Sequence, residues 1–192
     1  AQKCLLSFFG CGFLFVRREV ADGLTPAHLA RYGVDLDLPE TAHSREPIRY
    51  RTGALRFDLG NYNYLGVSAV ALSLDLIEEI GVDNVESHAR ALARRLVRGL
   101  LEEGVPVVGG DVGPHLAHIV TVGRFGAGQG DRDVEGLHRV LQEQAVVHTF
   151  RDGMLRFSVG LYNDETDIEM ALEAVRLWRR RGSRPATRKT GS

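Results

Sequence analysis

The chain has 192 residues, of which 44% are hydrophobic and 26% charged, a balance typical of globular domains that excludes a wholly disordered or collagen-like chain. The formal net charge of −1 excludes a general polyanion binder, so we expect no nucleic acid partner. No apolar run is long enough to cross a bilayer and two cysteines are too few for a disulfide framework, so we expect a cytoplasmic protein without a membrane partner.

The first quarter of the chain is predicted to be mostly irregular. Residues 5–16 are rich in Leu, Phe and Val around a Gly-Cys-Gly turn, which indicates two short extended pieces. Residues 25–32 are predicted to form a short helix, because a proline occupies its first turn. Residues 35–52 show no clear period and are predicted to form a long loop, and loops of this length are often functional.

Two helices are predicted in the middle of the chain. Over residues 66–80 apolar side chains recur at steps of three and four, and Gly81 ends this helix. A longer amphipathic helix follows and ends at Gly104. Its apolar stripe consists of Val85, Ala89, Leu92, Leu96 and Leu100.

The last part of the chain alternates between strand and helix signals. Short strands are predicted at 105–108, 118–122, 145–150 and 154–161, and helices at 133–144 and from Asn163 or Asp164 to Trp178. The dipeptide Asp152-Gly153 predicts a tight hairpin between the last two strands. The sequence therefore predicts an α/β protein that ends in a small α+β domain with a mainly antiparallel sheet.

Two basic side chains are the main candidates for chemistry. Lys3 is one of two lysines beside 22 arginines, and its apolar neighbours favour burial and a neutral, nucleophilic amine. In a pocket this amine could form a Schiff base with an aldehyde cofactor; the alternative is an ordinary surface charge. Arg156 lies in an apolar strand, where its guanidinium suits either a substrate carboxylate or a cross-strand salt bridge to an acid such as Asp152.

Other motifs are weaker. His115 and His118 have a spacing that suits two metal ligands on a helix, but the local sequence indicates a loop and then a strand, and we expect no metal site. The glycines at 10, 12 and 123–130 indicate turns rather than phosphate-binding loops. Apolar surroundings favour Cys4 and Cys11 as buried structural thiols.

Three segments, taken in order, resemble the class V aminotransferases of fold type I, which depend on pyridoxal 5′-phosphate (PLP). Residues 2–18 are similar to the lysine motif of this family, with the sequence QKCLLSFFGCGFLFVRR. Residues 56–66 resemble its Gly-Thr segment, with the sequence RFDLGNYNYLG. Residues 155–168 resemble its arginine strand and the turn that follows, with the sequence LRFSVGLYNDETDI. The resemblance extends over nearly the whole chain up to Trp178.

The resemblance implies roles for five residues. Lys3 would carry PLP and act as the base at the substrate Cα, and Arg156 would hold the substrate α-carboxylate. Gln2 replaces the histidine that precedes the lysine in the family, and its amide can still donate to the cofactor phosphate. Gly60 and Asn61 lie where the family contacts the phosphate of PLP in the neighbouring subunit, with Asn61 in place of a threonine. The resemblance therefore implies a homodimer with shared sites.

The resemblance also implies an activity and a domain organisation. Transamination of an amino-acid-like substrate is the leading reaction, followed by epimerisation or elimination; desulfuration is disfavoured because the short Arg151-Asp152-Gly153 turn before the arginine strand holds no cysteine and leaves no room for the cysteine loop of the desulfurases. The alternative from another class is a non-catalytic half-domain that serves as a dimerisation or interaction module. We expect the C-terminal half of a longer enzyme, with the end of a PLP-binding large domain at 1–81, a small domain at 82–178 and a basic disordered tail at 179–192.

Overall fold

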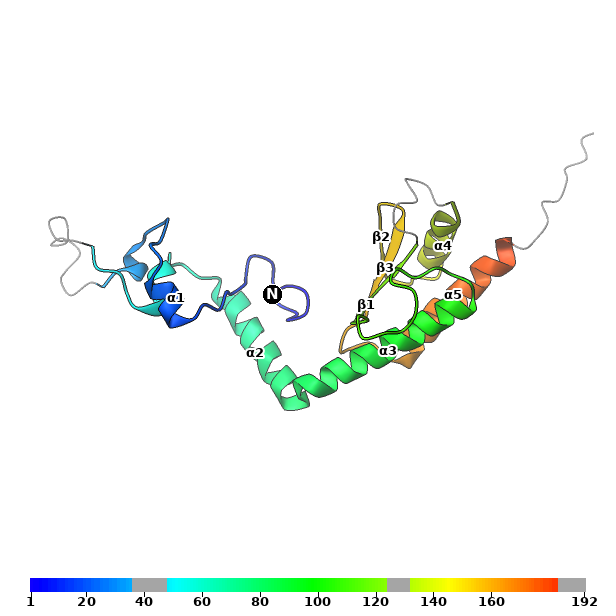
Figure 1. Cartoon of the computed structure of the whole chain (residues 1–192), viewed down its shortest axis with the longest axis horizontal. Coiled ribbons are helices and arrows are strands. Elements are labelled where there is room, and N and C mark those ends of the chain that lie inside the picture. Colours follow the sequence, from blue (N-terminus) through cyan, green and yellow to red (C-terminus); the bar gives the residue numbers. More distant parts are fainter. Residues whose placement is uncertain (36–47, 124–131, 183–192) are drawn as a thin grey trace, which may run out of the picture. The chain divides into compact units, whose positions relative to one another are not determined.

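A computed structural model of the chain describes residues 1–35, 48–123 and 132–182 (Figure 1). The chain divides into two compact units, Ala1–Leu76 and Ile77–Ser192. The assignment of residues 1–81 to a large domain and of 82–178 to a small one stays a prediction. None of the described helices is long and apolar enough to span a membrane.

The first unit contains the short helix α1 (Arg18–Asp22), the 3-10 turns η1 (Arg31–Gly33) and η3 (Gly53–Phe57), and most of α2 (Tyr64–Ile80). Polar contacts hold it together, with Arg56 at their centre. Its guanidinium donates to the carbonyl of Asp22 at 2.7 Å and to the carbonyl of Leu24 at 3.1 Å, and pairs with the Asp22 carboxylate at 2.9 Å. Gly53 N–H donates to the same carboxylate at 2.7 Å.

Several predictions for the first unit are wrong. Residues 5–16 form short turns and irregular backbone rather than strands, because no strand among the described residues pairs with them. The helix predicted at 25–32 is reduced to η1, since a short isolated helix with no apolar partner is unstable. Helix α1 was not predicted. The loop predicted at 35–52 lies largely outside the described residues.

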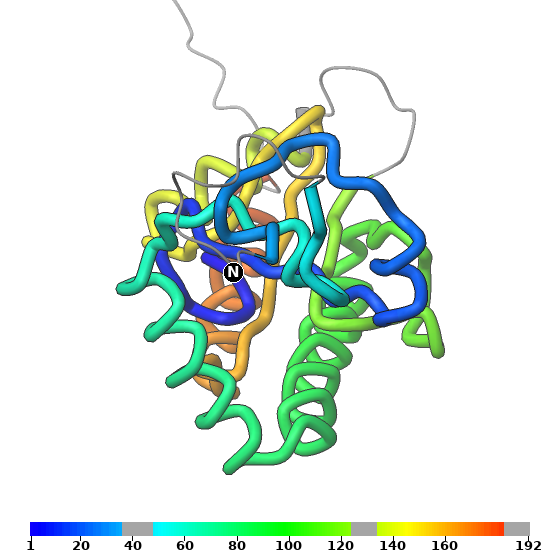
Figure 2. Tube along the Cα trace, turned by 90° about the vertical axis from the view of Figure 1, so that its left-hand side faces the viewer, coloured from blue at the N-terminus to red at the C-terminus, as the bar shows by residue number. Residues whose placement is uncertain are grey.

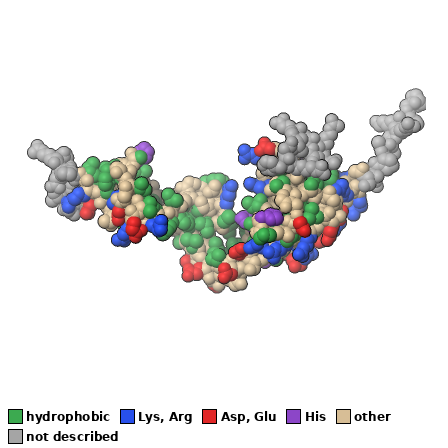
Figure 3. Space-filling view, viewed as in Figure 1, with side chains coloured by type: hydrophobic (Ala, Val, Ile, Leu, Met, Phe, Trp, Pro, Cys, Tyr) green, Lys and Arg blue, Asp and Glu red, His purple; other side chains and the backbone are tan. Residues whose placement is uncertain are grey.

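Much of the apolar surface of the first unit faces solvent. Phe9, Leu14 and Phe15 are each more than 80% exposed, and Leu72 of α2 is 70% exposed. Hydrophobic side chains accordingly gather on the surface of α2 and the loop beside it (Figure 3). The helix predicted at 66–80 is confirmed, but of its apolar stripe only Val70 is buried.

The second unit is a three-stranded antiparallel sheet with helices packed on one face. Its elements are α3 (Val82–Glu102), β1 (Ile119–Val122), α4 (Arg132–Glu143), β2 (Thr149–Arg151), β3 (Met154–Ser158) and α5 (Glu165–Gly182). The strand order is β1-β3-β2, with both neighbours antiparallel to the central β3. The combination of helices with a small antiparallel sheet confirms the predicted fold class. The helical coils of α2 and α3 can be followed in the Cα trace (Figure 2).

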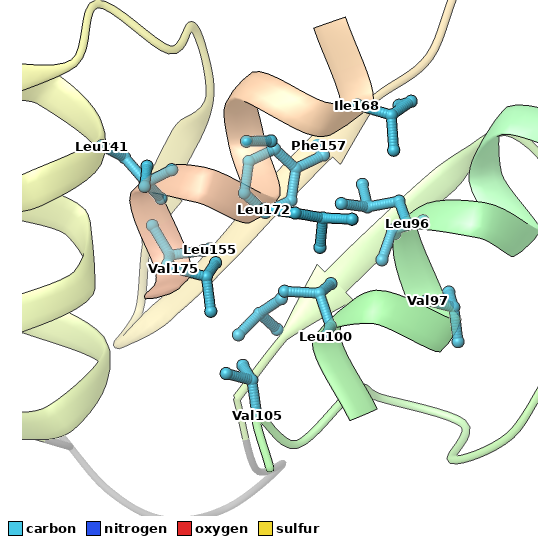
Figure 4. Packing of buried hydrophobic residues seen from close by; sticks show 14 of the residues in the cluster. Leu96, Val97, Leu100, Val105, Leu141, Leu155, Phe157, Ile168, Leu172 and Val175 are labelled. Atoms are coloured by element: carbon cyan, nitrogen blue, oxygen red, sulfur yellow. The ribbon is translucent and has the colours of Figure 1, made fainter. Parts of the chain in front are cut away.

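The core of this unit lies between the sheet and the three helices. Apolar side chains alternate along the strands and recur at helical spacing along α3, α4 and α5, so each element contributes one face. The residues packed between them include Leu96, Leu100, Leu141, Leu155, Phe157, Leu172 and Val175 (Figure 4). The opposite face of the sheet carries none of this cluster and holds the exposed residues of β3.

The β2–β3 hairpin fixes the strand register. Asp152 and Gly153 have φ angles of 53° and 75°, the backbone that a two-residue hairpin needs and that these two residue types tolerate. The predicted hairpin is therefore confirmed. The strand predicted at 105–108 is instead an isolated bridge between Val107 and Val122.

Helix α5 begins with a side-chain cap and is longer than predicted. The Asp164 carboxylate accepts the backbone N–H groups of Thr166 and Asp167 at 2.7 and 3.2 Å, which confirms Asp164 as the cap. Residues 179–182, predicted to belong to a disordered tail, form the last turn of α5. Arginines there interact favourably with the helix C-terminus, and Arg181 also pairs with Glu143 of α4. Residues 183–192 lie outside the described residues.

Candidate active site

Lys3 lies in an irregular loop of the first unit, at the N-terminal end of α2. The loop turns back on itself, with Leu6 N–H donating to the Lys3 carbonyl at 2.9 Å and Leu6 at a φ angle of 46°. The Ser7 hydroxyl donates to the Gly66 carbonyl at 2.9 Å, which fixes the loop against the first turn of α2. Lys3 itself is exposed, so the prediction of a buried amine is wrong for this chain. Phe8 and Phe9 of the same loop also face solvent.

The two cysteines lie in the same loop. Cys11 is half-buried, and a Cβ added to Gly66 would lie 2.8 Å from its Cβ, so the loop and helix approach closely here. Cys4 is exposed. The prediction of two buried thiols is therefore wrong, since only Cys11 meets a neighbouring element.

Gly60 and Asn61 form a tight turn just before α2. Both have left-handed backbone, with φ angles of 84° and 52°. A Cβ on Gly60 would lie 2.1 Å from the ring of Tyr32, so only glycine fits there. Asn61 is exposed. Since the Lys3 loop is fixed to Gly66, both the loop and this turn flank the start of α2.

Gln2 is exposed beside Lys3. Its amide and that of Asn61 offer N–H donors of the kind that phosphate oxygens accept. The first unit thus carries a primary amine and two amides open to a ligand.

Arg156 lies at the middle of β3 on the face of the sheet away from the core, and it is exposed. Unlike Arg56, Arg95 and Arg176, it makes no ion pair within the described parts of the chain. The salt bridge considered as an alternative is absent from the structure, because Asp152 pairs with Arg151 at 3.4 Å. The guanidinium is therefore available to an anionic ligand.

The loop after β3 is held by a network that the sequence analysis recognised only as a helix cap. The Asn163 side chain accepts Gly160 N–H at 2.8 Å and donates to Asp167 at 2.9 Å. Asp167 also accepts Asp164 N–H at 3.2 Å, and these hydrogen bonds lower the pKa of the Asp167 carboxyl. From α3, His88 Nε2 donates to the Asn163 carbonyl at 2.8 Å. The network fixes the end of the strand that carries Arg156, and the reciprocal Asp-x-x-Asp pair was its signal in the sequence.

A pair of histidines comes together that sequence reasoning missed. His138 Nδ1 of α4 lies 2.7 Å from His148 Nε2, and His148 Nδ1 lies 2.7 Å from the Val146 carbonyl. The His138 ring stacks on Phe150 with 4.6 Å between centroids. Burial, followed by the neighbouring His148, lowers the pKa of His138. No spacing signals this pair, because the residues belong to different elements.

His115 and His118 show no sign of a shared ligand. The His115 ring packs against Gly109 and Gly113, and His118 is half-buried. Across residues 1–35, 48–123 and 132–182, no three His, Cys, Asp or Glu side chains come together in a way that could hold a metal ion.

This chain resembles known proteins both in sequence and in fold. The family model described as "Aminotransferase class-V" matches residues 1–171. The chain is 24% identical over 176 residues to the uncharacterized aminotransferase YcbU of Bacillus subtilis, covering 91% of this chain and 43% of that protein. It is 27% identical to a probable cysteine desulfurase of Chlamydia muridarum, covering 86% of this chain and 42% of that protein.

A solved structure shows the same fold. The cysteine desulfurase CsdA of Escherichia coli matches with a TM-score of 0.71 at 17% identity, over 92% of this chain and 44% of that one. The chain thus spans less than half the length of each of these proteins.

Proposed function

Because this chain belongs to the class V aminotransferase family, whose cofactor is PLP, we propose that the whole protein is a PLP-dependent enzyme acting on the amino group or Cα of an amino-acid-like substrate. Transamination is the reaction we favour. When bound, PLP supplies an aldehyde that condenses with amines and stabilises negative charge at the substrate Cα. The side chains of the protein bind and orient the substrate and transfer protons.

The residues of the first unit fit this cofactor. Lys3 presents an exposed primary amine, which is the group that PLP requires. We propose that Lys3 Nζ holds the cofactor and then moves a proton at the substrate Cα. Gln2, Gly60 and Asn61 would donate to the phosphate, the last two across a homodimer interface. In the whole protein, we expect the exposed Lys3 loop and its apolar neighbours to be covered by other chain segments or by a second subunit.

The observation that carries the proposal is the guanidinium of Arg156 on the open face of the sheet, which has no ion-pair partner among the residues that the structure describes. A planar guanidinium binds a carboxylate through two parallel hydrogen bonds, which orients the amino group of an amino acid. Lysine at this position keeps the charge but loses the bidentate geometry.

The test uses Arg156→Lys and Arg156→Ala in the full-length protein. Both should leave the visible absorption of bound PLP unchanged and raise the KM for an amino acid by about tenfold or more. The matched control is Arg94→Ala, since Arg94 is exposed on α3 and its loss should change neither reading. Loss of bound PLP in the Arg156 variants would instead assign this residue a structural role.

Family membership by itself leaves transamination and desulfuration open, since both aminotransferases and cysteine desulfurases are relatives. Two features favour transamination. The two cysteines of the chain, Cys4 and Cys11, both lie in the first unit. The Arg156 strand follows a hairpin of only two residues, which offers no loop for a cysteine nucleophile. Incubation with L-cysteine and a thiol reductant, which releases persulfide sulfur as sulfide, should therefore give no alanine and sulfide; formation of both would favour desulfuration.

The rival from another class is a non-catalytic dimerisation or interaction module. It predicts that the full-length protein stays colourless when PLP is added. A visible absorption band that borohydride bleaches, and that Lys3→Ala abolishes, would exclude it.

A further inference from the structure

Arg156 does not stand alone on its face of the sheet. In the register of the three strands it lies directly opposite Thr121 of β1 on one side and Thr149 of β2 on the other. Residues directly opposite each other in antiparallel strands point to the same face, with Cβ atoms about 4.5–5.5 Å apart. The open face therefore carries a row of hydroxyl, guanidinium and hydroxyl.

The chemistry of this row matches a carboxylate. A carboxylate accepts about four hydrogen bonds, and a bidentate guanidinium supplies two of them. The strand register places one threonine on each side of Arg156 on the same face of the sheet, so two hydroxyl donors are available for the remaining lone pairs. Thr149 is exposed and Thr121 is half-buried, so neither is closed off from a ligand. No acidic residue belongs to the three described strands.

The neighbouring cross-strand pairs on the same face of the sheet carry other side chains. On one side Ser158 pairs with Ile119, and on the other Met154 pairs with Arg151, whose charge is met by Asp152. Among the described strand residues, the row of Arg156 alone combines a charge without an ion-pair partner with a hydroxyl on both sides. Threonine is also a common strand residue because it is β-branched. If Thr121 and Thr149 served only to form strands, valine at these positions would leave ligand binding unchanged, whereas a binding role predicts weaker binding.

We propose that Thr121 and Thr149 complete the carboxylate site of Arg156, each donating its hydroxyl hydrogen to one oxygen of the substrate α-carboxylate. The inference rests on the proposed function and adds two substrate-binding residues to it. It assigns the specificity for α-amino acids over plain amines to a three-residue row in the small sheet.

The experiment replaces each threonine by valine, which keeps the β-branched shape and removes only the hydroxyl. Full-length, PLP-loaded protein is titrated with L-alanine and with ethylamine, which lacks the carboxylate, and binding is followed by the change in visible absorption of the cofactor. L-cysteine and cysteamine form a second matched pair. Each valine variant should weaken amino-acid binding about tenfold and leave amine binding within about twofold.

Two further variants separate a binding role from a structural one. Thr121→Ser and Thr149→Ser keep the hydroxyl and should bind L-alanine within about threefold of wild type. The urea midpoint from Trp178 fluorescence should be the same or higher in the valine variants, because valine suits a strand. Equal changes for amino acid and amine, or no change for either, would overturn the proposal.

The outcomes also distinguish this inference from the proposed function. If Arg156→Ala removes the preference for the amino acid and the valine variants do not, the threonine role fails and the role of Arg156 stands. If Arg156→Ala leaves the preference intact, or if wild-type protein binds no PLP, the proposed function and this inference fail together.

Discussion

Helices α3 and α5 approach each other closely where Gly99 of α3 faces Leu172 of α5. A Cβ added to Gly99 would meet the Leu172 side chain at 2.5, 2.6 and 3.1 Å. Favourable carbon contacts lie at about 3.5–4.0 Å, so Leu172 would have to retreat by about 1 Å inside a packed core. Such overpacking costs about 1–3 kcal/mol. Alanine in place of glycine within a helix returns about 1 kcal/mol.

Because these two effects oppose each other, the sign of the stability change caused by Gly99→Ala should depend on the residue at position 172. In the wild-type background Gly99→Ala should lower the free energy of unfolding by up to about 2 kcal/mol, because the cost of the clash exceeds the gain in helix propensity. Leu172→Ala alone should cost about 2–5 kcal/mol, since this side chain is buried. In the Leu172→Ala background the clashing atoms are gone, and Gly99→Ala should instead stabilise by about 1 kcal/mol.

The assay is urea denaturation of the four proteins of this double-mutant cycle, followed by fluorescence. Trp178 is the one tryptophan of the sequence and lies half-buried in α5, so its emission reports on the unit that contains both positions. If Gly99→Ala has the same effect in both backgrounds, the two helices do not pack as described.

Three further predictions concern stability. Burial, followed by the neighbouring His148, lowers the pKa of His138, so the unfolded chain takes up a proton more readily and stability should fall as the pH drops below about 6.5. His138→Phe should flatten this dependence in pH-resolved urea titrations, and an unchanged slope would contradict the burial of His138 between α4 and its neighbours. Asp164→Ala should cost about 1 kcal/mol in the same assay, and no loss would show that its two backbone hydrogen bonds are dispensable. Gly60→Ala should loosen the first unit, seen as faster proteolysis there, because of the Tyr32 ring and the positive φ angle; an unchanged rate would refute the close approach.

The sequence was sufficient to predict the elements whose geometry is specified by residues close together in the chain. The stripe from Leu92 to Leu100 and the Asp152-Gly153 turn each specify a local geometry, and both are found in the small unit. In the first unit the same reasoning predicted α2 but was wrong for the segment that precedes it. Residues 5–16 have strand-like composition, but strand formation depends on a neighbouring strand, and their apolar side chains remain exposed.

The candidate site was predictable in its residues but not in its surroundings. Lys3 and Arg156 were chosen by motif, whereas the exposure of Lys3 depends on what packs against its loop. The hydroxyls beside Arg156 required the strand register, because Thr121 and Thr149 lie far from it in sequence. The His138–His148 pair likewise arises only from the packing of α4 against the sheet.

The central claim is that Lys3 carries the cofactor. It is tested most directly by reducing the full-length, PLP-loaded protein with borohydride, digesting it, and locating the fixed pyridoxyl group by mass spectrometry. We predict that the group is found on the peptide that contains Lys3 and not on the one that contains Lys189, the other lysine of this sequence. A peptide containing an unmodified Lys3, with the pyridoxyl group on another residue, would contradict the account.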